Sequence, residues 1–254
     1  MDAEIAGRQV TLSYPDAPGL RPFVESVLAG LDYPIVFPGV FEASTIVDIG
    51  AHAGAATVFL KSHYPDAEVL AFEPSSVAYA HLCSNVRDLP GVQTRRAALG
   101  GRDGDAKLYT GLYSSMQNSL KPNEENREAY ETVLQLDAHA AFDALERDVF
   151  SIVKIDTEGC ELEILDSIRP LLPAIEVVYL EYHSEADRLA IDRRLCPGFV
   201  LYAARADEPH RGTNSYVRAD VFARCSARLE QRYVFPKESG SYRLSRAISS
   251  SEDF

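Results

Sequence analysis

The stretch from Ile46 to Leu60, IVDIGAHAGAATVFL, restricts the fold more than any other part of the sequence. A short β-branched run ends at Ile49, glycines stand at positions 50 and 54, and a helical pattern follows. Glycine permits a sharp turn without a Cβ clash, and the helix that starts beyond it presents unpaired backbone N–H groups. A strand, a glycine turn and a helix in this order are typical of a nucleotide-binding turn.

The spacing of the two glycines narrows the choice of ligand. The pattern is GxxxG, which differs from the GxGxxG of dinucleotide-binding turns, and no GK[ST] of a phosphate-binding loop follows. Asp48 stands two residues before the first glycine, where its charge would repel a pyrophosphate. A ligand that carries an ammonium and a sulfonium would not be repelled.

A carboxylate further along the chain adds to this pattern. Glu73 ends the apolar segment LAFEP, and a carboxylate there can accept two hydrogen bonds from the cis-diol of a ribose. Glu73 alone could be an exposed strand-end carboxylate, and GxxxG alone is weak evidence for a nucleotide-binding turn. The ordered set of strand, DxGxxxG, helix, strand and Glu73 predicts an adenosine ligand with an amino-acid tail, which describes S-adenosylmethionine.

Strands and helices alternate along most of the chain, which predicts an α/β fold with a parallel sheet and helices on both faces. Runs such as SIVKI and VVYL are apolar throughout, as expected for strands covered on both sides. Ligands of such sheets bind at the carboxyl ends of the strands. We predict strands at 46–49, 68–72, 92–99, 151–156, 175–182, 199–203 and 215–222, and helices at 53–63, 75–87 (capped by Ser75), 159–168 and up to residue 195.

The remaining segments define the expected domain organisation. Residues 1–45 form an N-terminal lead-in or cap, with a strand at 8–12 and a helix at 22–30, and residues 46–236 form the main domain. A polar segment at about 100–136 interrupts the domain and could be a functional insertion or a surface excursion. The Ser-rich tail, 237–254, is expected to be mobile.

Composition excludes several classes of partner. The formal net charge of -13 repels phosphate backbones and anionic membranes, so we expect neither nucleic acid nor a membrane as a partner. The four cysteines contain no CxxC pair, which removes support for a zinc site and favours free, mostly buried thiols. The acidic N-terminus does not read as a signal peptide, and no apolar run approaches the ~18 residues of a membrane helix. We therefore expect a cytoplasmic protein.

A second block of sequence carries a family resemblance. Residues 152–165 read IVKIDTEGCELEIL and residues 178–183 read VYLEYH. Together with AFEP, AALGGRDG and LQLDAHAAF, they resemble the FkbM family of class I S-adenosylmethionine-dependent methyltransferases. Family members typically carry KIDVEG-A-E, and here Thr157 and Cys160 replace the usual Val and Ala. The resemblance covers residues 46–183.

The resemblance implies a Rossmann-like sheet of seven strands, mostly parallel, with an antiparallel last strand. It also implies methyl transfer, most often to a hydroxyl oxygen of a sugar or natural product, with S-adenosylhomocysteine as the product. Asp156, at the end of the fourth strand, would lie beside the reactive methyl group. The implied cofactor contacts are Asp48, Gly50, Ala51 and Gly54 at the methionyl end, Glu73 at the ribose, and Pro74, Ser75 and residues 96–98, including Ala98, at the adenine.

Methyl transfer to an alcohol requires an aligned nucleophile and a group that removes its proton. Asp156, Glu158, Glu181 and His183 stand at the ends of the fourth and fifth strands. Asp156, Glu181 and His183 are the predicted catalytic residues, and an unperturbed pKa of ~6.5 suits His183 as the base. Each could instead have a structural role. Carboxylates here could bind a divalent metal, but the motifs require none, and we predict no metal ligand.

Three functions stay open at this point. The first is O-methylation of a hydroxyl, or of a carboxylate to give an ester, on a small-molecule acceptor; a nitrogen acceptor is also open. The second is a nicotinamide-dependent oxidoreductase on a Rossmann fold, against which Asp48 and the missing GxGxxG argue. The third is a non-catalytic binding module that retains the cofactor fold. Acceptor identity and oligomeric state cannot be read from the sequence.

Overall fold

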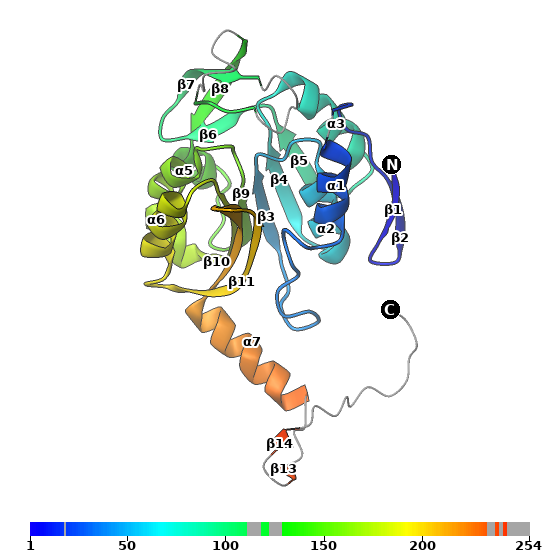
Figure 1. The fold of residues 1–254 in the computed structure, drawn as a ribbon, viewed down its shortest axis with the longest axis vertical. Helices are drawn as coiled ribbons and strands as arrows, with labels where there is room; N and C mark the ends of the chain where they lie inside the picture. Colours follow the sequence, from blue (N-terminus) through cyan, green and yellow to red (C-terminus); the bar gives the residue numbers. More distant parts are fainter. Residues whose placement is uncertain (18, 111–117, 122–128, 233–236, 239–240, 243–254) are drawn as a thin grey trace.

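A computed structural model describes residues 1–17, 19–110, 118–121, 129–232, 237–238 and 241–242. The chain begins with a hairpin of β1 (Asp2–Ile5) and β2 (Arg8–Thr11), followed by α1 (Leu20–Leu28). Both lie beside the main domain, against the helices that cover one face of its sheet (Figure 1). The strand and the helix predicted in the N-terminal lead-in are therefore present, with the helix beginning two residues earlier than expected.

A sheet of seven strands forms the centre of the molecule, in the order β11-β12-β10-β9-β3-β4-β5. Every strand except β12 runs in the same direction, because β12 pairs antiparallel with both of its neighbours. The mostly parallel sheet and its single antiparallel strand confirm the predicted fold class. The strands are β3 (Thr45–Ile49), β4 (Glu68–Phe72), β5 (Val92–Arg95), β9 (Phe150–Ile155), β10 (Ile175–Tyr182), β11 (Phe199–Glu208) and β12 (Arg211–Arg218).

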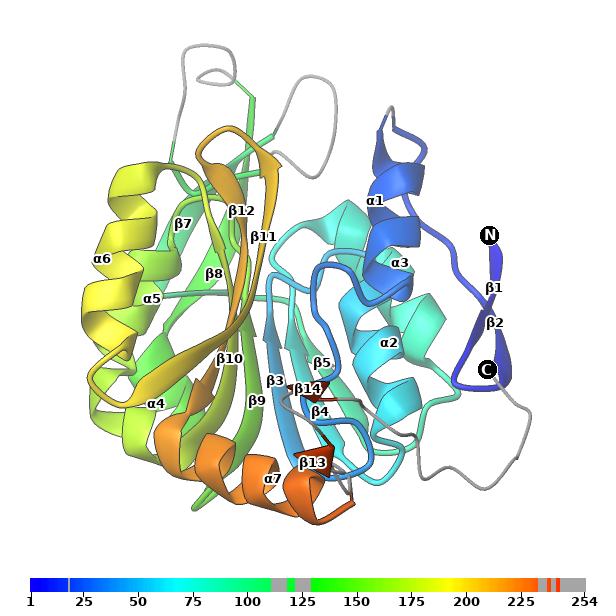
Figure 2. The ribbon, with the colours of Figure 1, turned by 60° about the horizontal axis from the view of Figure 1, so that its bottom comes forward.

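Helices cover both faces of this sheet (Figure 2). On one face lie α1, α2 (Ala55–His63), α3 (Ser76–Val86) and α7 (Ala219–Arg232); on the other lie α4 (Ala138–Asp143), α5 (Glu161–Ser167) and α6 (Glu185–Leu195), with the 3-10 turn η2 (Arg169–Ala174) leading into β10. Successive strand residues point to opposite faces. Ile46 accordingly packs in the first apolar core and Val47 in the second.

The predicted third strand, 92–99, is wrong in its second half. The sheet strand β5 ends at Arg95, and β6 (Ala98–Gly100) joins a separate sheet of order β6-β8-β7. A tight bend, in which the Ala97 N–H donates to the Arg95 carbonyl at 3.0 Å, separates the two. The described part of the predicted insertion thus contains β7 (Gly104–Tyr109) and β8 (Tyr130–Asp137), an antiparallel pair at the carboxyl-end side of the sheet (Figure 1).

The predicted last strand, 215–222, is also misplaced. The hairpin of β11 and β12 occupies 199–208 and 211–218, and helix α7 begins at Ala219. Val221 and Cys225, one helical turn apart, are buried against the sheet, which is why this segment is a helix rather than a continuing strand.

The tail contains the short strands β13 (Lys237–Glu238) and β14 (Ser241–Tyr242), which pair with each other. The rest of the segment predicted to be mobile lies outside the described residues. Among the four cysteines, all free, Cys160 and Cys225 are buried, Cys83 is partly buried and Cys196 is exposed. Within the described part of the chain, no helix has the length and apolar character to cross a membrane.

Candidate active site

A cavity of about 570 Å³ opens at the carboxyl ends of the central parallel strands, where the sheet topology predicts a ligand. Its walls come from the turn after β3, the ends of β4, β9 and β10, the small sheet of β6 and β7, the hairpin of β11 and β12, and helix α1. The residues that line it include Pro22, Phe23, Asp32, Gly50, His52, Glu73, Pro74, Ala97, Ala98, Leu108, Asp156, Glu158, Glu181, Arg205 and Arg211.

The turn after β3 brings two strand ends into close contact. Gly50 has a φ of 77°, and a Cβ at this position would lie 1.7 Å from the carbonyl oxygen of Asp156. Only glycine fits there, because the neighbouring atom is backbone and cannot move aside. Gly50 therefore lies on the cavity wall, as predicted, and also forms the junction between the ends of β3 and β9.

Gly54 has a packing role that the sequence did not reveal. It caps the start of α2 with a φ of 87°, and a Cβ here would lie 2.8 Å from Leu82 Cδ1 on α3. Neither Gly54 nor Ala51 is among the residues that line the large cavity; Ala51 lines a small adjacent pocket between α1 and α2. The predicted contacts of these two residues with the methionyl end remain predictions.

Asp48 lies beneath the cavity rather than on its wall. Its side chain is fully buried, with Oδ1 at 3.1 Å from Lys154 Nζ and Oδ2 accepting the Thr57 hydroxyl at 2.6 Å. Lys154 also donates to the Gly50 carbonyl at 2.6 Å. Burial alone would lower the pKa of Lys154, but the charges of Asp48 and Asp156 outweigh it and raise that pKa. Asp48 therefore stabilises the turn through Lys154.

Glu73 is the carboxylate that faces the cavity on the β4 side. Its two oxygens accept backbone N–H groups, of His52 and Ser75, each at 2.8 Å. His52 adopts a left-handed backbone conformation with a φ of 50°, and its N–H points at Glu73 in this conformation. Burial raises the pKa of Glu73 to about 7 despite these two bonds. Ser75 caps α3 through its hydroxyl, as predicted, and does not line the cavity.

The wall beyond Glu73 is apolar. Pro74 and Ala98, both predicted, lie on it with Ala97 and Leu99, and Leu108 reaches it from β7. Because Leu108 belongs to the small sheet, the predicted insertion contributes to the cavity. The carboxylate of Glu73 thus lies next to an apolar part of the cavity wall.

The opposite wall carries two carboxyl groups from adjacent strands. Asp156 follows β9 and Glu181 lies in β10, and the two residues come directly after the paired positions Ile155 and Leu180 of these adjacent parallel strands. Asp156 Oδ2 accepts the Tyr33 hydroxyl at 2.7 Å and lies 3.6 Å from Lys154 Nζ. Burial opposes the charge of Asp156, but Lys154, Glu181 and Tyr33 hold its pKa below its ordinary value. Burial and the charge of Asp156 raise the pKa of Glu181 well above its ordinary value.

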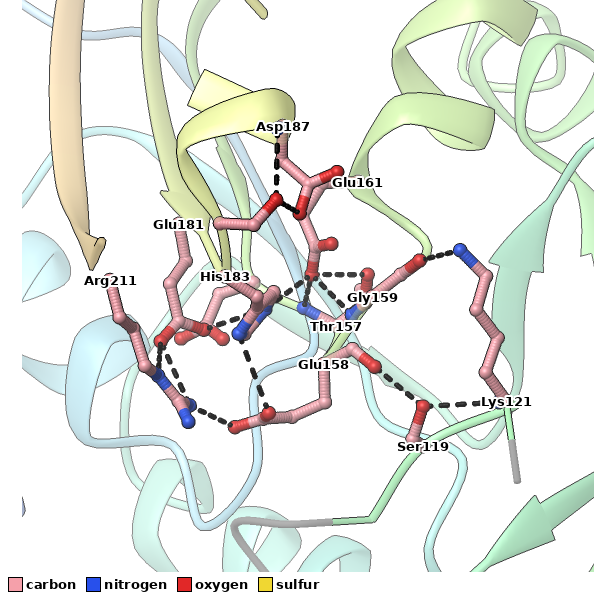
Figure 3. Close-up of polar contacts among 12 residues, drawn as sticks. Ser119, Lys121, Thr157, Glu158, Gly159, Glu161, Glu181, His183, Asp187 and Arg211 are labelled. Atoms are coloured by element: carbon pink, nitrogen blue, oxygen red, sulfur yellow. Dashed lines mark hydrogen bonds and ion pairs between the residues drawn. The ribbon is translucent and has the colours of Figure 1, made fainter. Parts of the chain in front are cut away.

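His183 lies behind these residues, among three carboxylates (Figure 3). Its Nε2 is 3.4 Å from Glu161 and 3.5 Å from Glu181, and its Nδ1 is 3.8 Å from Glu158. Burial would lower the pKa of His183, but the hydrogen bond and charge of Glu161, with the charge of Glu158, raise it. His183 is not among the residues that line the cavity, and these surroundings favour the protonated ring.

Glu161 and Arg211 complete this network. Glu161 Oε1 accepts the N–H groups of Thr157 and Gly159 at 2.9 and 3.0 Å, which shapes the loop that carries Glu158 (Figure 3). Arg211, at the start of β12, donates to Glu158 at 2.9 Å and to Glu181 at 3.1 and 3.2 Å. Glu158 has a φ of 54°, a strained conformation that is common at functional sites.

Glu158, Glu181 and His183 each offer a ligand atom within 4.8 Å of the others, so these three could hold a metal ion. The two carboxylates are already bound by the Arg211 guanidinium, and the ring faces acids on both sides. We therefore assign no metal to them.

Several residues that line the cavity or bond to its surroundings were not identified by any motif. Tyr33 and Asp32 follow α1, and Arg205 Nη1 on β11 donates to Asp32 Oδ1 at 2.9 Å and to the Ser26 hydroxyl. Tyr179 donates to the Pro34 carbonyl at 2.6 Å and anchors the same segment. No motif marks these positions. The one signal in the sequence for buried polar residues near this site was Lys154. A charged residue within an apolar strand requires buried polar partners.

Comparison with known proteins identifies a family. The family model of the methyltransferase FkbM domain matches residues 48–204. Methyltransferase 1 of Beauveria bassiana is 28% identical over 144 residues, covering 48% of this chain and 57% of that protein. Methyltransferase sdnD of Sordaria araneosa is 28% identical over 154 residues, covering 48% of this chain and 60% of that protein. The alignments thus span less than two thirds of either relative.

Among solved structures, the putative methyltransferase yhhF from Escherichia coli matches with a TM-score of 0.45 and 17% identity, covering 86% of this chain and 98% of that chain. Tyr33, which donates to Asp156, and Arg211, which lines the cavity, lie on either side of the matched residues 48–204, so segments beyond the family match contribute to this part of the site.

Proposed function

The chain belongs to the FkbM family of methyltransferases, and on this basis we propose that it transfers the methyl group of S-adenosylmethionine to an oxygen atom of a small molecule. The acceptor oxygen in this proposal is a hydroxyl group, as on a sugar or a natural-product intermediate. Bound S-adenosylmethionine supplies an electrophilic methyl group on a positively charged sulfur. The acceptor is a small molecule and not a nucleic acid, because the chain is strongly acidic.

The observation that carries the proposal is the pairing of Glu73 with an apolar wall. Both oxygens of Glu73 are oriented by backbone N–H groups, and the side chain faces a cavity of about 570 Å³. A ribose diol would donate two hydrogen bonds to this carboxylate and replace part of the hydration lost on burial. The adenine would lie against Pro74, Ala98 and Leu108.

The acidic wall opposite Glu73 supports an oxygen acceptor that is neutral. Asp156, Glu158 and Glu181 all line the cavity there. Like charges at close range repel, so a carboxylate acceptor would approach this wall at a cost that a hydroxyl does not meet. A hydroxyl acceptor also needs a group that takes its proton, and Asp156 or Glu181 can do so from the wall. His183 can do so only if the ring is neutral.

Calorimetric titration with S-adenosylhomocysteine tests the donor site, with NADH as the control ligand. We expect micromolar binding of the first and none of the second. Glu73→Ala should weaken S-adenosylhomocysteine binding by well over about tenfold, because the diol loses both acceptors. Glu68→Ala is the matched control, since Glu68 lies at the opposite, exposed end of the same strand. Near-normal affinity in a folded Glu73→Ala protein, or binding of NADH, would contradict the proposal.

Incubation with methyl-labelled S-adenosylmethionine and a panel of hydroxylated, carboxylated and amino compounds tests the acceptor class. We expect label in ethers and not in esters or amines. The same assay separates the candidate bases: if His183→Ala keeps the full rate across pH while Asp156→Asn or Glu181→Gln does not, the base is a carboxylate. Label found in esters or amines would overturn the hydroxyl acceptor.

A further inference from the structure

A cluster of three polar residues lines the cavity between α1 and the hairpin of β11 and β12. Its members are Ser26 on α1, Asp32 after that helix and Arg205 on β11. The Ser26 hydroxyl donates to Asp32 Oδ2 at 2.6 Å, and Arg205 Nη1 donates to Asp32 Oδ1 at 2.9 Å and to the Ser26 hydroxyl oxygen. This Ser26–Asp32–Arg205 cluster has no part in the donor site proposed above.

Strand pairing fixes where the cluster lies relative to the predicted catalytic residues. Arg205 of β11 pairs with Thr213 of β12, and Thr213 pairs with Glu181 of β10. Directly paired residues point to the same face of a sheet, and two strand spacings of about 4.8 Å separate Arg205 from Glu181 by about 10 Å. The next strand, β9, ends just before Asp156. Arg205, Glu181 and Asp156 therefore line the cavity in this order along the strand ends.

The segment after α1 contacts both ends of this row. Asp32 bonds to Arg205 at one end, and the next residue, Tyr33, donates to Asp156 at 2.7 Å at the other. The side chain of Asp32 is 6% exposed and that of Arg205 is 34% exposed. The buried carboxylate thus orients the guanidinium, and the guanidinium is the member of the pair that a molecule in the cavity can reach.

The charges on this part of the wall are compensated in pairs. Arg205 is paired with Asp32, and Arg211 is paired with Glu158 at 2.9 Å (Figure 3). An anionic ligand would be attracted by either guanidinium and repelled by the carboxylate beside it, and a cationic ligand would meet the reverse. A hydroxyl group both donates and accepts, so it matches a wall on which donors and acceptors alternate.

Resting on the proposed function, we propose that the acceptor is a neutral ring compound with at least two hydroxyl groups, which binds between α1 and the β11–β12 hairpin. The hydroxyl to be methylated lies at Asp156 and Glu181, and a second hydroxyl accepts a hydrogen bond from Arg205. Pro22 and Phe23, which line the cavity from α1, contact the ring carbons. Because α1 precedes the matched residues 48–204 and Arg205 follows them, the flanking segments select the acceptor.

A matched set of cyclohexane derivatives tests this class, with methyl-labelled S-adenosylmethionine as the donor. The set consists of cyclohexanol, the cyclohexanediols, hydroxycyclohexanecarboxylate and aminocyclohexanol, with methyl glucoside as a larger polyol. We expect kcat/KM for the best neutral polyol to exceed that for cyclohexanol and for both charged analogues by at least about tenfold, because only the polyol bonds to the Arg205 guanidinium without an uncompensated charge.

Several outcomes would overturn the inference while the proposed function stands. They are equal kcat/KM values for cyclohexanol and the polyols, a preference for a charged analogue, and no label in any of these compounds with a protein that binds S-adenosylhomocysteine. Failure to bind S-adenosylhomocysteine would instead overturn the proposed function.

Variants of the cluster locate the second hydroxyl. Arg205→Gln should bring the polyol-to-cyclohexanol ratio of kcat/KM to within about threefold, while S-adenosylhomocysteine still binds within about threefold of wild type. Ser26→Ala keeps both charges and should lower the ratio by about threefold, which tests the cluster even if Arg205→Gln does not fold. Arg194→Gln is the matched control, since its partner Asp166, at 2.7 Å, lies on α5 away from the cavity. An unchanged ratio in Ser26→Ala or in folded Arg205→Gln, or an equal loss in Arg194→Gln, would overturn the inference.

Discussion

The two sides of the cavity are built in different ways. We name the side with Gly50, Glu73 and Ala98 the cofactor half, after the function proposed for it, and it is shaped by backbone: glycine conformations, N–H groups and a bend between strands. The other side, which we name the acceptor half after its proposed function, comprises Asp156, Glu181 and Arg211 together with Tyr33, which donates to Asp156, and it is shaped by charged and polar side chains. The first half lies within the family match, and the second takes Tyr33 and Arg211 from outside it.

This difference has a physical cause. A nucleoside is bound by contacts that short local segments can supply, such as a turn, a strand end and a helix start. An acceptor site with a proton-accepting group needs charges inside a cavity, and each buried charge needs partners. Those partners come from several elements, including segments on either side of the family match.

The largest effect on stability is expected at Gly50, where the two halves are in contact. Gly50→Ala would place a Cβ 1.7 Å from the Asp156 carbonyl oxygen, and we expect it to lower the free energy of unfolding by at least about 3 kcal/mol or to prevent folding. Urea unfolding measures this. Gly198→Ala is the control, since a Cβ there meets nothing within 4 Å. A stable Gly50→Ala protein would show that the two halves are not in fixed contact.

A substitution of Glu161 tests how the loop after β9 in the acceptor half is stabilised. Glu161→Ala leaves the N–H groups of Thr157 and Gly159 without an acceptor and removes a carboxylate from His183. We expect a loss of about 2 to 3 kcal/mol in unfolding free energy. Glu163→Ala, on the same helix, loses a single bond from the Gly101 N–H at an exposed site and should cost clearly less. Equal losses in the two variants would mean that Glu161 does not organise the loop.

Tyr33 tests the link between the N-terminal segment and the acceptor half. Tyr33→Phe removes the hydroxyl that donates to the Asp156 carboxylate, and we expect a loss of about 1.5 to 2 kcal/mol because the acceptor is charged. Tyr179→Phe removes a bond of similar length to the Pro34 carbonyl and should cost about 1 kcal/mol. Thermal unfolding compares the two. A larger loss in Tyr179→Phe would indicate that Tyr33 only anchors the segment.

The smallest expected effect is a pH dependence in the cofactor half. Burial raises the pKa of Glu73 to about 7, so the ionised form that accepts a diol becomes populated as pH rises through that value. The affinity for S-adenosylhomocysteine should therefore increase about tenfold between about pH 6 and pH 8. In the free protein the sign is opposite and the window lies at lower pH: because the pKa of Glu73 is raised in the folded state, stability falls as pH rises from the ordinary pKa of a Glu, ~4.3, to about 7, and is level above that. Glu73→Gln should flatten the binding profile, and an unchanged slope would assign it to another group.

The cofactor half was largely predictable from sequence. Glu73 lines the cavity where the ordered motif placed it, because it directly follows a strand whose apolar run is visible in the sequence. Pro74 and Ala98 line the cavity where the family resemblance implied them. Asp48 and Gly54 belong to the same motif, but the residues that they contact come from other elements. Asp48 contacts Lys154 of β9, and Gly54 lies against Leu82 of α3. The predicted contact of Asp48 with the methionyl end stays a prediction.

The boundaries of β5 and β12 were not predictable for a related reason. An apolar run continues from Val92 to Leu99, and only the bend at Ala97 and the pairing of β6 with β8 divide it between two sheets. Hydrophobic periodicity predicts which residues of a segment are buried, but it does not predict which sheet or helix they pack against.

By itself, the sequence determined the alternation of strands and helices, the turn after β3 and the carboxylate at the end of β4, since these follow from local backbone preference and from burial along single segments. The tertiary structure alone decided that Tyr33 bonds to Asp156 and Arg211 to Glu181 at the strand ends. These residues are separated by up to 178 positions (from 33 to 211), and their contacts depend on the stacking of strand ends in space. Buried charges acquire their protonation states from such contacts, so their chemistry becomes readable only once the fold brings them together.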